Sequence, residues 1–242
     1  ETPSRAARRF VFTPATYLRA FAVAAPALRL VAGDTVTTST VDAGGWGRGA
    51  YGDRRNKLTE GGNPLVGPFY VEHALPGDVL EVTLHNVSLN RGWAFSGTWL
   101  VDNAIETSYA TRRVSDTQRI DNTWVLDTVA MRARRTTDTG ALAGYTVPLT
   151  PFLGVIATAP GREFTPSSRE SGGYGGNMEN RYMRTGTTVL LPVTLRGAYL
   201  YLGDGHAAQG DGETPGDAME PSIDVTFSVK VRRWGFQTGV RA

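Results

Sequence analysis

The chain has 242 residues, of which 40% are apolar and 20% are charged, as in a folded globular protein that buries a core. Because it contains no cysteine, disulfides, Cys-ligated zinc, iron–sulfur clusters and thiol nucleophiles are excluded. Its 25 Lys and Arg residues are interspersed with 23 Asp and Glu residues and form no basic stripe, which argues against a nucleic-acid partner.

The N-terminal region bears on where the protein resides. The chain begins at Glu1 rather than at a methionine, which suggests a processed or trimmed N-terminus. A removed export signal would place the protein in the periplasm, and otherwise we expect it in the cytoplasm. The longest apolar run, Phe21 to Ala27, is too short to span a bilayer and contains Pro26, so we expect no membrane insertion.

Short Val- and Thr-rich runs between Gly and Pro turns predict a mainly β fold, a single domain over residues 1–242 with a sandwich or barrel-like architecture. The alternation of apolar and polar residues is clearest in the last run and indicates a half-buried antiparallel strand. Helical turns are expected only at Ala104–Thr111 and Asp204–Ala208. The expected strands are Arg9–Thr13, Thr35–Val41, Val79–Asn86, Thr123–Thr128, Val155–Ala159, Thr188–Leu195, Ala198–Leu202 and Ile223–Arg232.

The most informative segment for function runs from Gly203 to Glu213. It reads Gly-Asp-Gly-His-Ala-Ala-Gln-Gly-Asp-Gly-Glu, so three carboxylates, one imidazole and one amide are separated almost entirely by Gly and Ala. Small residues allow polar groups to crowd around one point, and Gly permits the turns that such crowding needs. An apolar run leads directly into the segment, which favours a site at the mouth of buried strands over a solvated Gly-Asp turn.

Three segments together carry a family resemblance. They are Gly-Pro-Phe-Tyr-Val-Glu at 67–72 with Pro-Gly-Asp-Val-Leu at 76–80; Pro-Phe-Leu-Gly-Val-Ile-Ala-Thr-Ala-Pro at 151–160 with Gly-Gly-Asn-Met-Glu at 175–179; and Leu-Pro-Val at 191–193 through the 203–213 segment to Glu220. In order and spacing the chain resembles the acetamidase/formamidase family from about Leu28 to Val231. The resemblance implies a β-dominated fold, hydrolysis of short aliphatic amides to carboxylate and ammonia, and a homo-oligomer.

The chain also departs from the family pattern. Glu179 stands where the family has Asp, and His73 follows Glu72 where a small residue is common. Residues 88–138 match no family segment that we can place, and elements that gate the substrate would fit there. A non-catalytic binding or assembly module, or a hydrolase of another C–N bond, therefore stays open as an alternative.

Amide hydrolysis needs an activated nucleophile, a stabilised oxyanion and a protonated leaving group. The sequence has neither cysteine nor a Gly-x-Ser-x-Gly motif, so water activated by a metal or a carboxylate is the simplest chemistry. We predict a divalent metal, with zinc and calcium both admissible, bound by Asp42, Asp204, His206 and Glu213.

Three of the predicted catalytic residues, His206, Glu72 and Asn177, have a plainer alternative. His206 would be an acid or base as well as a ligand, although a lone turn histidine is often only solvated. Glu72 would emerge at a strand end or be a simple surface carboxylate, and Asn177 would donate to an oxyanion or hold a left-handed turn. Gln209 would orient the substrate amide. His85 lies in strand alternation and is interpreted as structural.

Overall fold

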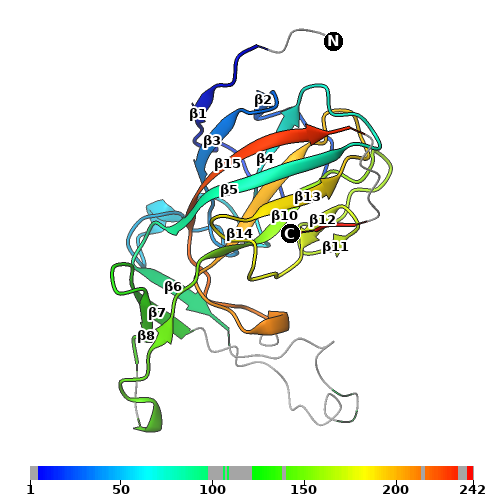
Figure 1. The fold of residues 1–242 in the computed structure, drawn as a ribbon. Coiled ribbons are helices and arrows are strands. Elements are labelled where there is room, and N and C mark those ends of the chain that lie inside the picture. The colour runs from blue at the N-terminus through cyan, green and yellow to red at the C-terminus, as the bar shows by residue number, and fades with distance from the viewer. Residues whose placement is uncertain are drawn as a thin grey trace.

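The computed structural model describes residues 5–97, 106, 108, 122–137, 140–213, 216–233 and 239–241. The expected mainly β fold is confirmed, with three sheets and a few short turns of 3-10 helix (Figure 1). These turns are Arg54–Asn56, Gly140–Leu142 and Asp211–Glu213. Among the described residues, no helix has the length and apolar character needed to cross a membrane.

The first sheet has five strands in the order β1-β3-β15-β5-β13. The two longest strands, β5 and β15, pair antiparallel along nearly their whole length. β15 covers the predicted range, and its apolar residues from Ile223 to Val229 are buried. The sheet comprises β1 (Arg9–Val11), β3 (Thr35–Ser39), β15 (Ile223–Arg232), β5 (Val79–Leu89) and β13 (Thr188–Pro192).

The second sheet has six strands in the order β11-β12-β10-β14-β4-β2. Its central strands β10 and β14 are buried at every position, because the first sheet covers one face and further chain covers the other. The sheet comprises β11 (Ser171–Gly172), β12 (Gly175–Asn177), β10 (Phe152–Thr158), β14 (Leu200–His206), β4 (Leu65–Val71) and β2 (Leu28–Leu30).

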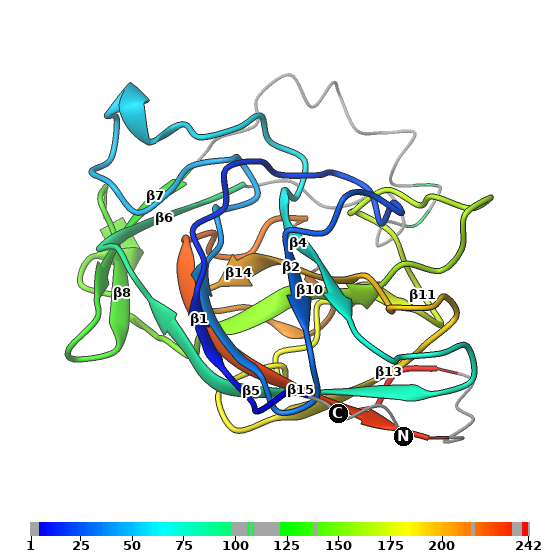
Figure 2. The same ribbon diagram turned by 90° about the horizontal axis from the view of Figure 1, so that it is seen from above.

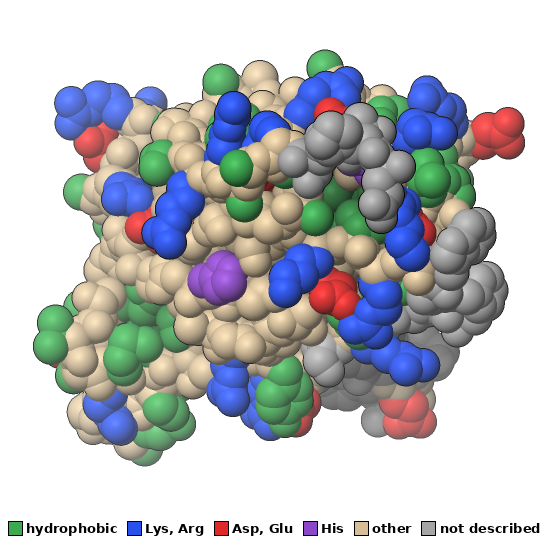
Figure 3. Space-filling view, turned by 45° about the horizontal axis from the view of Figure 1, so that its top comes forward, with side chains coloured by type: hydrophobic (Ala, Val, Ile, Leu, Met, Phe, Trp, Pro, Cys, Tyr) green, Lys and Arg blue, Asp and Glu red, His purple; other side chains and the backbone are tan. Residues whose placement is uncertain are grey.

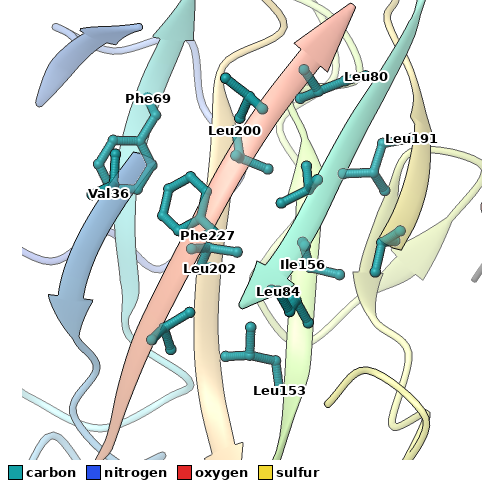
Figure 4. Close-up of a cluster of buried hydrophobic side chains, with 14 of the residues drawn as sticks. Val36, Phe69, Leu80, Leu84, Leu153, Ile156, Leu191, Leu200, Leu202 and Phe227 are labelled. Carbon is teal, nitrogen blue, oxygen red and sulfur yellow. The ribbon is translucent and has the colours of Figure 1, made fainter. Parts of the chain in front are cut away.

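The two large sheets face one another as a sandwich, with β5, β13 and β15 on one side of β4, β10 and β14 (Figure 2). Apolar side chains from both sheets meet between them (Figure 4). Phe69 and Phe227 pack ring against ring at 5.3 Å across this core. Burial of each such side chain stabilises the folded state by about 1.5–3 kcal/mol, and this packing fixes the position of β14.

A third, smaller sheet lies at one end of the sandwich (Figure 1). Its own apolar cluster includes Ala207 and Met219, which lie just beyond the last residue of β14 and just before β15. The end of β14 is therefore enclosed between the sandwich and this sheet. The sheet comprises β6 (Trp93–Ser96), β7 (Asn122–Asp127), β8 (Arg132–Arg135) and β9 (Val147–Pro148).

The segment from Gly203 to His206 differs from its expected structure. The helical turn expected at Asp204–Ala208 is wrong, because residues through His206 belong to β14 and are buried. The two glycines fit tight contacts: a Cβ at Gly205 would lie 2.6 Å from Ile223 of the facing sheet, and one at Gly203 would lie 2.8 Å from the main chain of Pro64. The helical turn expected at Ala104–Thr111 lies outside the described residues, apart from positions 106 and 108.

Candidate active site

His206 occupies the centre of the site as the last residue of β14. It lies opposite Phe152 of β10 in the ladder, and the two rings meet edge to face with centroids 5.1 Å apart. The side chain is fully buried. The alternative of a solvated turn histidine is therefore wrong, and contact with Phe152 restricts the orientation of the ring.

Four carboxylates surround the His206 ring. Nδ1 lies 3.1 Å from Oε2 of Glu179. On the opposite edge of the ring, Nε2 lies 3.2 Å from Oε1 of Glu220, 3.6 Å from Oδ1 of Asp204 and 3.7 Å from Oε1 of Glu213. We call these five residues the His206 cluster.

Each carboxylate reaches the cluster from a different local structure. Asp204 is two residues before His206 on β14, with φ of 53°, and Glu179 follows β12. A Cβ on Gly154 would lie 3.0 Å from both oxygens of Glu179, so that glycine leaves room for the carboxylate. Glu213 ends the last 3-10 turn, and Glu220 bridges to Phe95 of β6.

Hydrogen bonds from outside the cluster orient its carboxylates. The main-chain N–H of Ala218 donates to Oε1 of Glu213 at 2.9 Å and to Oε1 of Glu220 at 3.0 Å. The side-chain amide of Asn63 donates to Oδ2 of Asp204 at 2.9 Å, which leaves Oδ1 of that residue on the side of His206. Such supporting contacts fix the direction of side chains that bind metals.

Among the residues that the structure describes, several buried polar atoms of the cluster find no hydrogen-bond partner. They are both ring nitrogens of His206, both oxygens of Glu179, Oδ1 of Asp204 and Oε2 of Glu220. Leaving a buried polar group unpaired costs about 1–3 kcal/mol, so such a concentration is expected where a ligand completes the site. Two sets, Glu179-His206-Glu213 and Asp204-His206-Glu220, each bring three ligand atoms within 4.8 Å of one another. The residues therefore fit a divalent cation.

Burial and like charge dominate the electrostatics of the cluster. Burial, reinforced by the neighbouring carboxylates, raises the pKa of Glu213 to about 8 and that of Glu220 to about 7. Burial likewise raises the pKa of Glu179. For His206, burial lowers the pKa, but Glu220, Glu179 and Asp204 outweigh this and raise it well above its usual value. Burial and mutual repulsion thus oppose full ionisation of these carboxyl groups, and a cation bound among them would favour their ionised forms.

Most of the site residues predicted from the 203–213 segment lie close together in the structure. Asp204, His206 and Glu213 belong to the cluster. Gln209 donates from Nε2 to the main-chain oxygen of Glu179 at 3.0 Å, and its Oε1 is buried without a partner. Asn177 lies in β12, so the left-handed-turn alternative for it is wrong. The Oδ1 of Asn177 accepts a hydrogen bond from the side-chain amide of Asn63 at 2.9 Å. The same amide also donates to Asp204, so Asn63 links Asn177 to the cluster.

Glu72 does not join the site, and the expectation that it would converge with His206 is wrong. In the β4–β14 ladder, Leu65 pairs with Gly203 and Phe69 with Leu200. Glu72 follows one end of this ladder, whereas His206 ends β14 at the other end. At about 3.3 Å per residue, the two residues are roughly 30 Å apart along the strands. Glu72 instead forms an exposed ion pair with Arg29 at 3.0 Å, so the surface-carboxylate alternative is the correct one.

Asp42 is buried but is not among the residues that bring ligand atoms around His206. Its Oδ2 forms a 2.6 Å ion pair with Arg91, and its Oδ1 accepts from the main-chain N–H of Trp46. Arg91 in turn donates to the main-chain oxygen of Glu220 at 2.8 Å. The structure therefore places Asp42 behind the cluster, where it anchors Arg91.

Glu179, Glu220 and Asn63 were missing from the predicted site. Glu179 and Glu220 both lie in the segments that carried the family resemblance, which is the signal that would have found them. No sequence signal marks Asn63, whose contact with Asp204 joins residues 141 positions apart. His85 is structural as expected, because its Nε2 hydrogen-bonds to the hydroxyl of Ser228 at 2.8 Å on the neighbouring strand.

A small and a larger cavity, both bordered by described residues, lie beside the cluster. The small one of about 160 Å³ is bordered by Glu213, Ser96 and Ala218. The larger one of about 500 Å³ is bordered by Phe152, Arg181 and Arg184, among others. Four residues border both cavities: Ala208, Gln209, Gly210 and Met219.

The sequence of this chain matches the model of the acetamidase/formamidase family over residues 32–172 and 165–240. The chain belongs to this family. It is 26% identical over 216 residues to a curated protein of Schizosaccharomyces pombe named "Putative formamidase C869.04". That match covers 71% of this chain and 52% of the yeast protein, so the chain spans about half the length of that relative.

Solved structures of the family share the fold. The acetamidase of Bacillus halodurans is 26% identical, with a TM-score of 0.75, and the match covers 96% of this chain and 74% of that one. A predicted acetamidase/formamidase from Thermoanaerobacter tengcongensis is 24% identical, with a TM-score of 0.77, over 97% of this chain and 73% of that one. The overall fold of this chain is thus similar to that of these proteins.

Proposed function

We propose that the chain hydrolyses short aliphatic amides of the formamide and acetamide type at the His206 cluster, with a divalent cation as cofactor. The observation that carries the proposal is the enclosure of one imidazole by four carboxylates whose buried atoms lack partners. Membership of the acetamidase/formamidase family supports the choice of amides as the substrate.

His206, Asp204 and Glu220 would hold the cation, because they form a fully buried ligand set. An imidazole ligand favours zinc over calcium, which takes oxygen ligands. The bound cation would supply a positive charge that polarises the amide carbonyl and makes water more acidic. Glu179 would orient the ring through Nδ1, in the way that carboxylates commonly support histidine ligands.

The reaction forms a bond between the water oxygen and the amide carbon and breaks the C–N bond. The acyl part leaves as carboxylate and gives up one water proton to solvent. The other water proton passes to the nitrogen, which leaves as ammonia. Glu213 borders the small cavity, so its carboxylate is placed to accept this proton and return it to the nitrogen. The Oε1 of Gln209, buried without a partner, would accept a hydrogen bond from the substrate N–H₂.

Ammonia release from formamide and acetamide tests the proposal. We expect release by the wild-type chain and a loss of about 10²–10⁴-fold in Glu213→Gln, the usual contribution of a general base. Glu72→Gln is the matched control, since it removes a carboxylate far from the cluster and should release ammonia at the wild-type rate. The proposal fails if the folded wild-type protein releases no ammonia, or if both variants behave alike.

A further inference from the structure

The larger cavity beside the His206 cluster has a character that the hydrolysis of formamide or acetamide does not require. Its volume of about 500 Å³ far exceeds the space that such a small amide occupies. One wall is apolar and includes Val147, Phe152 and Met219. Arg181 and Arg184 also border it, so the cavity combines an apolar surface with positive charge.

The two arginines of the cavity differ in their partners. Arg181 forms an ion pair with Asp211 at 3.2 Å, with both side chains largely exposed. Arg184 has no carboxylate partner in the part of the chain that the structure describes, and its guanidinium lies 6.0 Å from the ring centroid of Tyr182. A guanidinium offers paired N–H donors that match the geometry of a carboxylate.

The cavity lies next to the cluster, because some of its lining residues also contact cluster residues. The ring of Phe152 borders the cavity and packs against His206. Gln209 borders both this cavity and the small one beside Glu213, and it is bonded to the main chain of Glu179. These shared contacts place the cavity on the side of the cluster where Phe152 and Gln209 lie.

We propose that this cavity binds the carboxylate end of the substrate, and that the preferred substrates are monoamides of short dicarboxylic acids. This inference rests on the proposed function for its reaction. Succinamate and water would give succinate and ammonia, with the same C–O bond formed and the same C–N bond broken as in the simple amides. The apolar wall contacts the methylene groups, and Arg184 pairs with the carboxylate that is not consumed.

The test compares succinamate with succinamide, which has the same length but an uncharged amide in place of the carboxylate. We expect the wild-type protein to show the higher kcat/KM for succinamate. Arg184→Gln should lower the ratio of the two kcat/KM values about tenfold, because a charge-assisted hydrogen bond contributes on that scale. Arg196→Gln is the matched control, since Arg196 is exposed and precedes the opposite end of β14. Equal kcat/KM values in the wild type, or a ratio that Arg184→Gln leaves unchanged, would overturn the inference.

Calorimetric binding of succinate separates failure of this inference from failure of the proposed function. If no amide is hydrolysed but succinate binds and Arg184→Gln abolishes the binding, the carboxylate site stands and the hydrolysis proposal fails. If succinate does not bind, the carboxylate site is overturned whatever the activity. If acetate binds as tightly as succinate, the site recognises any free carboxylate and the assignment to dicarboxylate monoamides is overturned.

Discussion

Arg91 donates a 2.8 Å hydrogen bond to the main-chain oxygen of Glu220, and it is itself buried with 1% of its side chain exposed. Its five N–H groups all have acceptors: the carboxylate of Asp42 and the main-chain oxygens of Trp46, Gly47, Trp93 and Glu220. The guanidinium therefore links the segment after β3 to the segment that carries a cluster carboxylate. Asp42, which was predicted as a metal ligand, instead holds this arginine in place and so supports the cluster indirectly.

Arg91→Met should lower the free energy of unfolding by about 3–5 kcal/mol, because it leaves the buried carboxylate of Asp42 without its counter-charge. Urea titration followed by fluorescence measures the change. Arg48→Met is the matched control: it breaks the exposed ion pair with Asp224 and should cost at most about 1 kcal/mol. Equal effects of the two substitutions would show that Arg91 does not have the assigned structural role.

Gly205→Ala should destabilise the fold by about 1–3 kcal/mol, the usual cost of overpacking a core. The added Cβ would lie 2.6 Å from side-chain atoms of Ile223, so the two large sheets would have to separate locally. Gly210→Ala serves as the control, since nothing lies within 4 Å of the corresponding Cβ. A melting temperature for Gly205→Ala equal to that of Gly210→Ala would contradict the close approach of β14 and Ile223.

The strands β15 and β14 show which parts of the fold can be predicted from the sequence. Alternation along Ile223–Arg232 gave the correct strand because one face of β15 is buried and the other is not. A helical turn was expected at Asp204–Ala208, in a segment whose glycines suggest turns, whereas in the structure Gly203 and Gly205 allow close contacts inside a strand. The Gly-Asp-Gly-His motif nevertheless supplies two members of the His206 cluster, Asp204 and His206, whose polar side chains are buried at the end of that strand.

The remaining differences are long-range. Glu72 was placed in the site because it follows an apolar run, but sequence does not tell which end of a strand faces the motif. Asn63 could not be found, because its role depends on the pairing of β4 with β14. On the face seen in Figure 3, Lys and Arg side chains are spread among other residues, in keeping with the interspersed charge of the sequence.

Asn63→Gly should weaken binding of the proposed cation about 10–100-fold, the usual effect of removing a supporting contact to a ligand. Gly is suitable because Asn63 has φ of 51°, which glycine adopts without strain. Competition with a chromophoric chelator measures the affinity, and circular dichroism checks the fold. Unchanged affinity in a folded variant would show that the bond from Asn63 does not orient Asp204.

Stability at acidic pH should depend on Asp34. Burial raises the pKa of this carboxyl, but hydrogen bonds from Arg5 and from the main-chain N–H groups of Val31 and Arg8 prevail and lower it below 3.8. Because the folded pKa is below the unfolded one, the stabilisation is present above about pH 4 and is lost as pH falls through the folded value.

Urea titrations between pH 2 and pH 6 test this dependence, a range set by the reference pKa of about 3.9 for Asp. The free energy of unfolding should fall more steeply toward low pH in the wild type than in Asp34→Asn. Parallel curves for the two proteins would mean that the Asp34 carboxylate carries no more stabilisation when ionised in the fold than in the unfolded chain.

The metal content of the purified protein, measured together with ammonia release from acetamide on the same sample, tests the central claim most directly. We predict a divalent metal in stoichiometric amount, loss of both metal and ammonia release after chelation, and recovery of both when zinc is restored. His206→Asn should bind far less metal, because it removes the nitrogen ligand shared by both candidate sets. A metal-free protein that releases ammonia at the undiminished rate would contradict the account.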